Sequence, residues 1–146
     1  MTPTPFNIGL IGLGVMGQRM LARLQGHERL RATHVWDADP QAVARTLSSY
    51  PQLLGAAGAE ALIAAPGLRT LYIATPPAPH MALANRAFDA GLAVFCEKPL
   101  TVDFDAARRT IARIEREGRR AAVNVSLASS PGLAALQAAW QECPNG

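Results

Sequence analysis

A glycine-rich turn near the start of the chain is the feature that most constrains its fold. An apolar run over residues 8–11, typical of a buried parallel strand, leads into the turn, and a helical pattern follows over 16–24. Gly12 permits a tight turn, Gly14 permits close approach of a pyrophosphate, and Gly17 permits close packing of the helix on the strand. The free N–H groups at the start of that helix favour phosphate. The predicted dinucleotide-binding residues are Gly12, Gly14, Val15, Met16 and Gly17.

A carboxylate follows the second strand pattern at the distance expected for ribose binding. The run over residues 32–36 ends in Asp37, twenty residues after Gly17. A carboxylate at this position can accept hydrogen bonds from both ribose hydroxyls of an adenosine. It would repel a 2′-phosphate, and Ala38 supplies no arginine beside it, so we expect NAD, with NADP the less favoured cofactor. The other interpretation of the glycines is a structural turn in an unrelated α/β domain.

Strand and helix patterns alternate along the chain. This alternation predicts an α/β fold with a doubly wound parallel sheet, the Rossmann fold, because right-handed crossovers place helices on both faces. Ligands of such sheets bind beyond the carboxyl ends of the strands. We expect a nucleotide-binding domain over residues 1–127 and a helix leading away over 128–146. Further strands are expected at 53–54, 71–74, 93–96 and 121–125.

Composition narrows the possible partners. The 146 residues, 49% of them apolar, suit one hydrophobic core. The net charge of +3 comes mostly from arginine, without the aromatic interleaving or motif expected of nucleic-acid binding. No segment approaches the ~18 consecutive apolar residues of a membrane span. Cys96 and Cys143 show no metal spacing and no secretory context, so we expect a cytoplasmic setting and no metal, nucleic-acid or membrane partner.

Lys98 is the only lysine in the chain, beside 13 arginines. It follows a buried strand pattern and lies between Glu97 and Pro99. Arginine keeps its proton at useful pH, whereas a partly buried lysine can release it. We therefore interpret Lys98 as a titrating group, either a proton donor or an orienting cation for a substrate oxygen. The alternative is a structural lysine in a salt bridge with Glu97.

Four more residues follow strand patterns at the same predicted edge. Thr75 and Pro76 are expected to form a wall beside the cofactor through their backbone groups. Glu97 could hold Lys98 or contact the cofactor, and a plain carboxylate at a strand end is the other possibility. His80 begins a helix, where it could contact the nicotinamide end of the cofactor or cap its own helix. The residues alone leave both roles open.

Taken together, these segments resemble the Gfo/Idh/MocA family of oxidoreductases. The resemblance covers residues 6–127 and is carried by the glycine turn with Asp37, by Ala-Thr-Pro-Pro-Ala-Pro-His at 74–80 and by Cys-Glu-Lys-Pro-Leu at 96–100. It implies NAD(P)-dependent oxidation or reduction of a sugar, polyol or related carbonyl compound. It also implies that Lys98 contacts the reacting hydroxyl or carbonyl and helps to move its proton, and it allows a cis bond before Pro99.

Family members continue with a second domain that supplies most of the substrate pocket, a further catalytic histidine or aspartate, and the usual oligomer contacts. Because this sequence stops at Gly146, we expect a single nucleotide-binding domain with the usual second domain absent, and little turnover by the 146-residue chain alone. Two alternatives remain open: a non-catalytic dinucleotide-binding or sensing module, and another two-domain reductase, such as an amino-acid or biliverdin-type enzyme.

Overall fold

One parallel sheet organises the molecule. The computed structural model describes residues 5–125 and 130–142, and within them the strands follow the order β3-β2-β1-β4-β5-β6, with every neighbouring pair parallel. This arrangement confirms the doubly wound sheet that the alternation predicts. The strands are β1 (Phe6–Ile11), β2 (Leu30–Trp36), β3 (Leu54–Gly55), β4 (Thr70–Ile73), β5 (Ala93–Glu97) and β6 (Ala121–Asn124).

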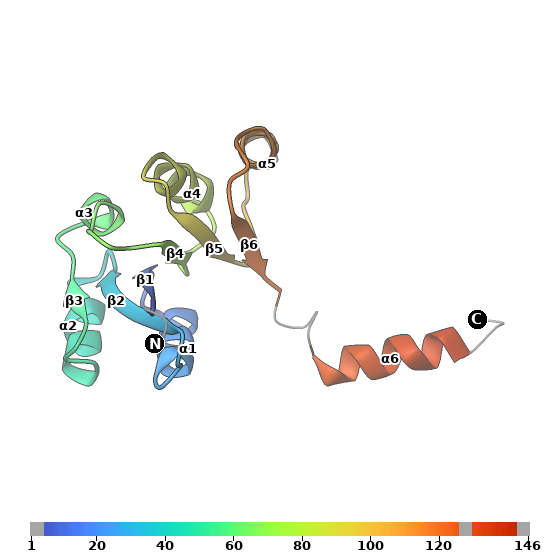
Figure 1. Ribbon diagram of the computed structural model, residues 1–146, viewed down its shortest axis with the longest axis horizontal. Helices are drawn as coiled ribbons and strands as arrows, with labels where there is room; N and C mark the ends of the chain where they lie inside the picture. Colours follow the sequence, from blue (N-terminus) through green and yellow to red (C-terminus); the bar gives the residue numbers. More distant parts are fainter. Residues whose placement is uncertain (1–4, 126–129, 143–146) are drawn as a thin grey trace.

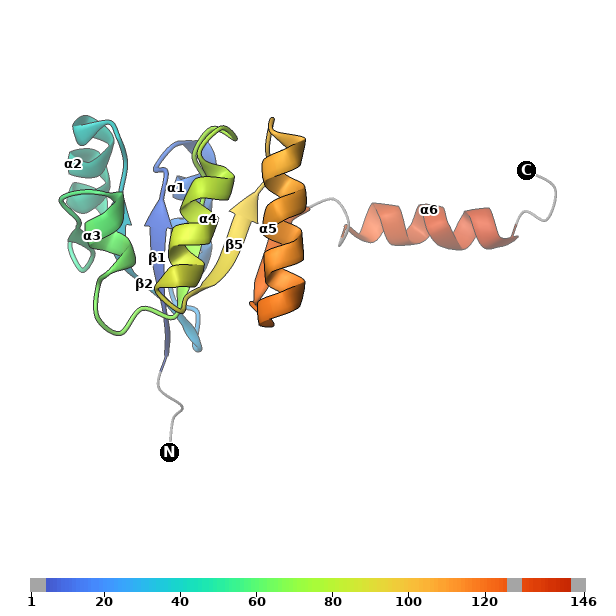
Figure 2. The ribbon, with the colours of Figure 1, turned by 90° about the horizontal axis from the view of Figure 1, so that it is seen from above.

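The helices cover both faces of this sheet. Figure 1 shows α1 and α2 below the strands and α3, α4 and α5 above them, and Figure 2 shows α3, α4 and α5 side by side from above. This distribution follows from right-handed crossovers that start in opposite directions from β1. The helices are α1 (Val15–Leu24), α2 (Pro40–Ser49), α3 (Ala59–Ile63), α4 (His80–Asp89), α5 (Phe104–Glu117) and α6 (Pro131–Glu142).

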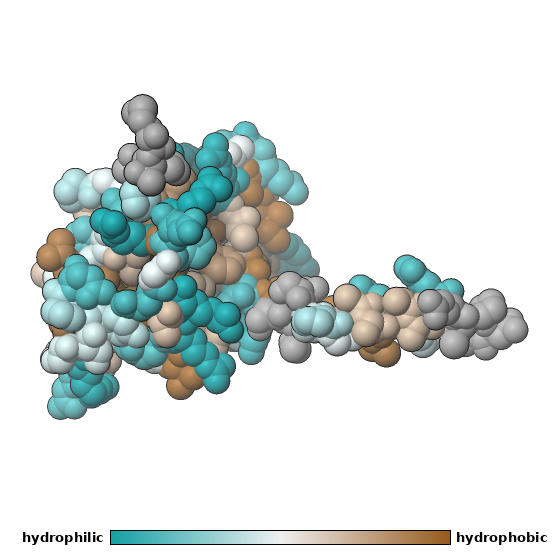
Figure 3. All heavy atoms as spheres, turned by 60° about the horizontal axis from the view of Figure 1, so that its bottom comes forward, coloured by the Kyte–Doolittle hydropathy of each residue, from teal (hydrophilic) through white to brown (hydrophobic). Residues whose placement is uncertain are grey.

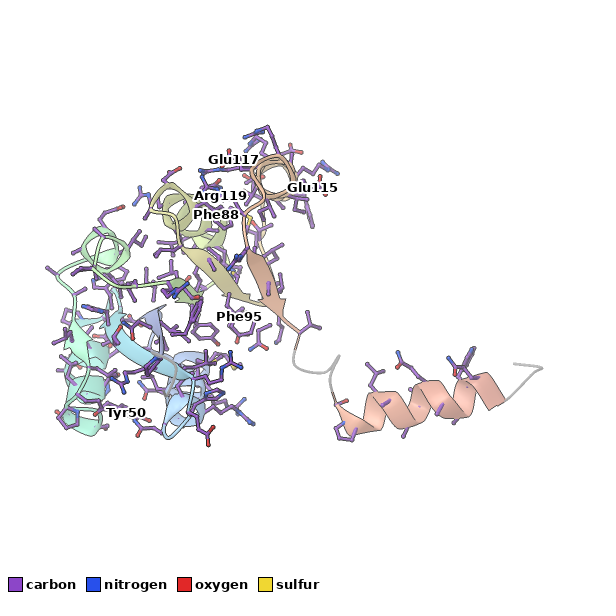
Figure 4. The ribbon with its side chains drawn as sticks, in the orientation of Figure 1. Tyr50, Phe88, Phe95, Glu115, Glu117 and Arg119 are labelled. Atoms are coloured by element: carbon purple, nitrogen blue, oxygen red, sulfur yellow. The ribbon has the colours of Figure 1, made fainter. Side chains whose placement is uncertain are left out.

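The core has two layers because side chains alternate across each strand. Leu10 of β1 packs with Leu21 of α1, whereas its neighbour Ile11 packs in the other layer, against α3 and α4. Figure 4 shows the same division at β5, where Phe95 lies on the α1 side of the sheet and Phe88 of α4 lies on the opposite side.

Some boundaries differ from those expected. Strand β2 begins at Leu30, two residues before the strand expected at 32–36, and β3 is displaced by one residue to Leu54–Gly55. Helix α6 forms where it was predicted and stands apart from the sheet (Figure 3). Its Leu136 and Trp140 side chains are exposed. The predicted boundary between residues 127 and 128 lies outside the described residues.

Candidate nucleotide-binding site

Four strands end at the same level. The register pairs Ile11 with Ile73, Ile73 with Cys96, and Cys96 with Val123. Parallel strands lie about 4.8 Å apart, so the glycine turn after β1 and the segment after β5 are separated by about two strand spacings, or ~10 Å. The sheet thus brings to one edge the segments that the sequence singles out. The next residues along these strands are Gly12, Ala74, Glu97 and Asn124.

The three glycines of the turn have different surroundings. Gly12 has φ +95°, and a Cβ there would lie 2.5 Å from the carbonyl carbon of Ala74. A Cβ at Gly17 would clash with the carbonyl oxygen of Gly12, so these two positions require glycine for internal packing. Gly14 is exposed, and a Cβ there would meet no atom within 4 Å. The open side of the turn at Gly14 is therefore the place where a ligand can approach the backbone.

The amino end of α1 faces this opening without a protein cap. Gly14 occupies the N-cap position and offers no side-chain hydrogen bond, and the first turn contains no acidic residue. The first helical N–H that bonds to a backbone carbonyl is that of Gln18, which donates to Gly14. In the described part of the chain, the N–H groups of Val15 and Met16 have no hydrogen-bond partner. Free N–H groups and the positive end of the helix dipole together favour an anion here.

Asp37 lies beside the glycine turn, as predicted. Its Oδ2 accepts a hydrogen bond of 2.6 Å from the N–H of Leu13, and its Oδ1 accepts one of 2.8 Å from the N–H of Asp39. The carboxylate is partly exposed, and each of its oxygens retains a second lone pair for another donor. The same group therefore fixes the turn and remains able to accept hydroxyl groups of a ligand.

Glu97 is buried, and only 3% of its surface is exposed. Its Oε1 accepts hydrogen bonds of 2.5 Å from the Tyr72 hydroxyl and 2.5 Å from the Asn124 side-chain amide. Burial, together with the Glu97 carboxylate, raises the pKa of Tyr72 well above its usual range. Burial and the same carboxylate raise the pKa of the Cys96 thiol to about 12. A salt bridge between Glu97 and Lys98 is absent from the described residues, so the structural alternative for Lys98 is wrong in that form.

Sequence reasoning missed this three-residue network. Tyr72 reads as one member of an apolar strand, and Asn124 as the polar end of another. The available signal was the tyrosine itself, because a buried phenol hydroxyl normally requires a hydrogen-bond partner. Which partner it finds depends on the register of β4, β5 and β6, which the sequence alone does not provide.

Lys98 emerges from this network at the open edge. It is exposed, whereas Glu97 before it is buried. The Lys98–Pro99 peptide bond is cis, as the family resemblance allows. On the neighbouring loop, Pro76 is exposed, and the Thr75 hydroxyl is buried without a hydrogen-bond partner among the described residues. A buried hydroxyl without a partner is costly, and a polar group of a ligand at this edge would fit it.

His80 lies behind these loops and is fully buried. Its Nδ1 lies 3.1 Å from the carbonyl oxygen of Leu100, and its Nε2 lies 2.9 Å from that of Thr75. Helix α4 has no side-chain cap, so the expectation that His80 could cap its own helix is wrong. A direct contact between His80 and the cofactor stays a prediction, and both ring nitrogens already face protein carbonyl groups.

Comparison with known proteins places this geometry in a family. The family model described as an oxidoreductase family with an NAD-binding Rossmann fold matches residues 6–125. The chain belongs to the Gfo/Idh/MocA family. An inositol 2-dehydrogenase of Pseudomonas fluorescens is 35% identical over 121 residues, which cover 77% of this chain and 34% of that protein. This Gfo/Idh/MocA chain thus spans about a third of the length of the curated relatives it matches.

Solved structures share the fold of this Gfo/Idh/MocA domain. A proposed myo-inositol dehydrogenase from Sinorhizobium meliloti has a TM-score of 0.83 and 26% identity, covering 94% of this chain and 41% of that one. Biliverdin reductase from Synechocystis, in complex with biliverdin and NADP+, has a TM-score of 0.77 and 25% identity, covering 82% of this chain and 38% of that one. The family model describes an NAD-binding Rossmann fold, and this neighbour holds NADP+.

Two features are absent from the described residues. No helix there has the length and apolar character needed to cross a membrane. No group of three histidine, cysteine, aspartate or glutamate side chains there could hold a metal ion.

Proposed function

We propose that this chain is the cofactor-binding part of an NAD-dependent oxidoreductase that acts on a hydroxyl or carbonyl carbon of a sugar or polyol. One observation carries the proposal: the open glycine turn at an uncapped helix and the chain's only lysine stand on one sheet edge, about two strand spacings apart. The family and the inositol dehydrogenases among its relatives support the reaction and the substrate class.

The turn holds the diphosphate of the cofactor. The N–H groups of Val15 and Met16 would donate to phosphate oxygens, and Gly14 leaves room for them. Asp37 accepts hydrogen bonds from the adenosine ribose. Thr75 and Pro76 line the path toward Lys98, with Gly12 and Gly17 shaping the turn from within. Bound NAD supplies or accepts the hydride.

Lys98 manages the proton that accompanies this hydride transfer. During reduction its ammonium group donates a proton to the carbonyl oxygen as that oxygen gains negative charge. During oxidation the neutral amine accepts the hydroxyl proton. Arginine could orient the oxygen but not exchange the proton, which explains why a chain that otherwise uses arginine carries lysine here. Glu97 stays buried in its hydrogen-bond network with Tyr72 and Asn124 and so fixes the backbone on the amino-terminal side of Lys98.

Cofactor choice follows from Asp37. A 2′-phosphate placed beside its carboxylate would be repelled, and the next residue, Ala38, offers no compensating positive charge. Fluorescence titration of the 146-residue chain should therefore show tighter binding of NADH than of NADPH. Asp37→Asn keeps an acceptor for Leu13 but removes the charge, and it should weaken NADH binding about tenfold while reducing the preference over NADPH. Tighter NADPH binding by the unaltered chain would overturn the assignment of NAD.

The single lysine allows a direct test of its place beside the cofactor. Reductive ¹³C-methylation labels amines, which in this chain are the Lys98 side chain and the N-terminus. Addition of NAD+ should shift the dimethyl-Lys98 signal and leave the N-terminal signal unchanged. If NAD+ binds and the Lys98 signal does not move, the sensing or binding module becomes the better interpretation.

Turnover by the isolated 146-residue chain should be very low. Hydride transfer requires that the second face of the nicotinamide be covered, so that water is excluded and substrate is positioned. The edge described above is open at Gly14, Val15 and Lys98. Steady-state oxidation of inositol or a related polyol by this chain, measured as NADH formation, would contradict this expectation.

A further inference from the structure

His80 links the two loops that carry the predicted nicotinamide side of the site. It is the first residue of α4 and has no exposed surface. Thr75, whose carbonyl oxygen faces Nε2, follows β4, and Leu100, whose carbonyl oxygen faces Nδ1, follows β5. The imidazole ring therefore bridges two loops that are far apart in the sequence and adjacent at the sheet edge.

The ring can act only as a donor toward these two carbonyl groups. A neutral imidazole donates one hydrogen bond, to either Leu100 or Thr75 depending on the tautomer, and an imidazolium donates to both. Because the side chain is fully buried and both nitrogens are directed at backbone oxygens, neither nitrogen is left to bond to a ligand. The contacts of His80 point to an effect on the loops themselves.

Lys98 lies between two anchored residues. On its amino-terminal side, Glu97 is held by Tyr72 and Asn124. On its carboxyl-terminal side, two residues along the chain, the carbonyl of Leu100 faces the His80 ring. The exposed lysine therefore stands on a short segment with a buried polar contact at each end, so its backbone position depends on both contacts.

We propose that His80 is a positioning residue: by donating from Nδ1 to the Leu100 carbonyl oxygen, it fixes the segment that carries Lys98. The proposal rests on the proposed function, because the position of Lys98 matters for catalysis only if its side chain meets a substrate oxygen beside the cofactor. It assigns to His80 a role through the backbone of another residue, without contact to substrate or cofactor.

Two variants distinguish between the two possible hydrogen bonds of the His80 ring. The amide nitrogen of His80→Asn can occupy the place of Nδ1 and donate to Leu100, whereas that of His80→Gln can occupy the place of Nε2 and donate to Thr75. His80→Phe removes both donors and keeps a ring. Asn85→Ala is the matched control, because Asn85 lies on the same helix and its side chain bonds to Met81, Thr110 and Arg113, away from the two loops.

The readout is the ¹³C signal of dimethyl-Lys98 without cofactor. His80→Gln and His80→Phe should displace or broaden this signal, while His80→Asn should keep it close to that of the unaltered chain, and the N-terminal signal should stay in place throughout. The proposal is overturned if His80→Asn moves the signal as far as His80→Gln does, or if Asn85→Ala moves it equally. It is also overturned if all folded His80 variants keep the original signal.

The unaltered chain gives a second test that does not depend on variants folding. A long-range ¹H–¹⁵N spectrum of the histidine rings reports which nitrogen of His80 carries a proton. The proposal requires a proton on Nδ1, and an unprotonated Nδ1 overturns it. If the unaltered chain does not bind NADH but the Lys98 signal responds to the His80 variants as expected, the proposed function is wrong and the positioning role of His80 is still supported. The two failures are therefore distinguishable.

Discussion

The turn after β1 and the loops after β4 and β5 share one edge of the sheet, yet they are held in different ways. The turn is shaped by close contacts of backbone with backbone, which Gly12 and Gly17 permit. The two loops are held by buried side chains, His80 between the loops and Glu97 within the Tyr72–Asn124 network. The turn depends on close backbone packing, which includes Gly12 against Ala74, and the two loops depend on hydrogen bonds of buried side chains. Substitutions should therefore damage the two regions differently.

The largest effect is expected at Gly17. A methyl group there clashes with the backbone carbonyl oxygen of Gly12, which cannot move without displacing the turn. Gly17→Ala should therefore lower the free energy of unfolding by about 3 kcal/mol or more, measured by urea denaturation, and should abolish NADH binding.

Gly14→Ala is the matched control for this clash. Its Cβ meets no atom within 4 Å, and the position has φ −69°, which suits any residue. Its free energy of unfolding should fall by less than about 1 kcal/mol, since alanine is a poorer N-cap residue than glycine, while NADH binding weakens because the methyl group occupies the approach of the diphosphate. Equal stability losses in Gly17→Ala and Gly14→Ala would contradict the conclusion that Gly17 is required for internal packing and Gly14 for the approach of a ligand.

Much of the fold, and the first half of the site, can be predicted from the sequence because their signals are local. Glycine spacing, an apolar run and a carboxylate twenty residues after Gly17 indicate the turn and the place of Asp37. The extra hydrogen bond from Leu13 to Asp37 could not be predicted, because it depends on how the loop after β2 returns to the turn.

The second half of the site was predictable only as a set of residue types. The sequence indicates that Glu97, Lys98 and His80 are candidate site residues, but it does not indicate which of them faces the ligand. Lys98 is exposed, whereas Glu97 and His80 are buried, and this division depends on which face of the sheet and which side of α4 each occupies. His80 faces two carbonyl groups and does not cap its own helix, and its expected contact with the cofactor stays a prediction.

Removing one donor from the buried network should have the next largest effect. Tyr72→Phe keeps the ring beside Phe95, with centroids 5.5 Å apart in the unaltered chain, and takes away the hydroxyl that donates to Glu97. A buried carboxylate that loses a donor should cost about 1–3 kcal/mol of unfolding free energy, measured by urea denaturation at pH 7. Tyr50→Phe, at the end of α2 and outside this network, should cost much less. Similar losses in both variants would show that the Glu97 network does not hold its loop.

Alkaline pH should act on the same region through Cys96. Burial raises the pKa of this thiol to about 12 in the folded state, from 9.0. The stabilisation is therefore complete below pH 9 and is lost as pH rises toward 12, because the unfolded chain ionises first. Cys96 should lower the free energy of unfolding by about 1.4 kcal/mol per pH unit in this window, and Tyr72, whose pKa burial also raises, should add to the slope above pH 10. Cys96→Ala should lower stability at pH 7 but flatten the slope; an unchanged slope would contradict the assignment.

The smallest effect is expected at Glu117, at the opposite edge of the sheet from the site. Figure 4 shows Glu117 and Arg119 near the end of α5, where hydrogen bonds from Arg113, Arg119 and Arg116 lower the pKa of Glu117 to about 2. A carboxyl with a lowered pKa stabilises the fold above its ordinary pKa of 4.5, and that contribution is lost as pH falls toward 2.

Glu117→Gln should therefore be slightly less stable than the unaltered chain at pH 7, and the difference should shrink in 1 M salt, because these ion pairs are exposed enough to be screened. It should also shrink as pH falls toward 2, where the Glu117 carboxyl becomes protonated. NADH binding should stay unchanged, because this cluster lies at the amino edge of the strands. A loss of NADH binding in Glu117→Gln would mean that the two edges of the sheet are coupled through α5. It would contradict the conclusion that the loops after β4 and β5 are held only by contacts at their own edge.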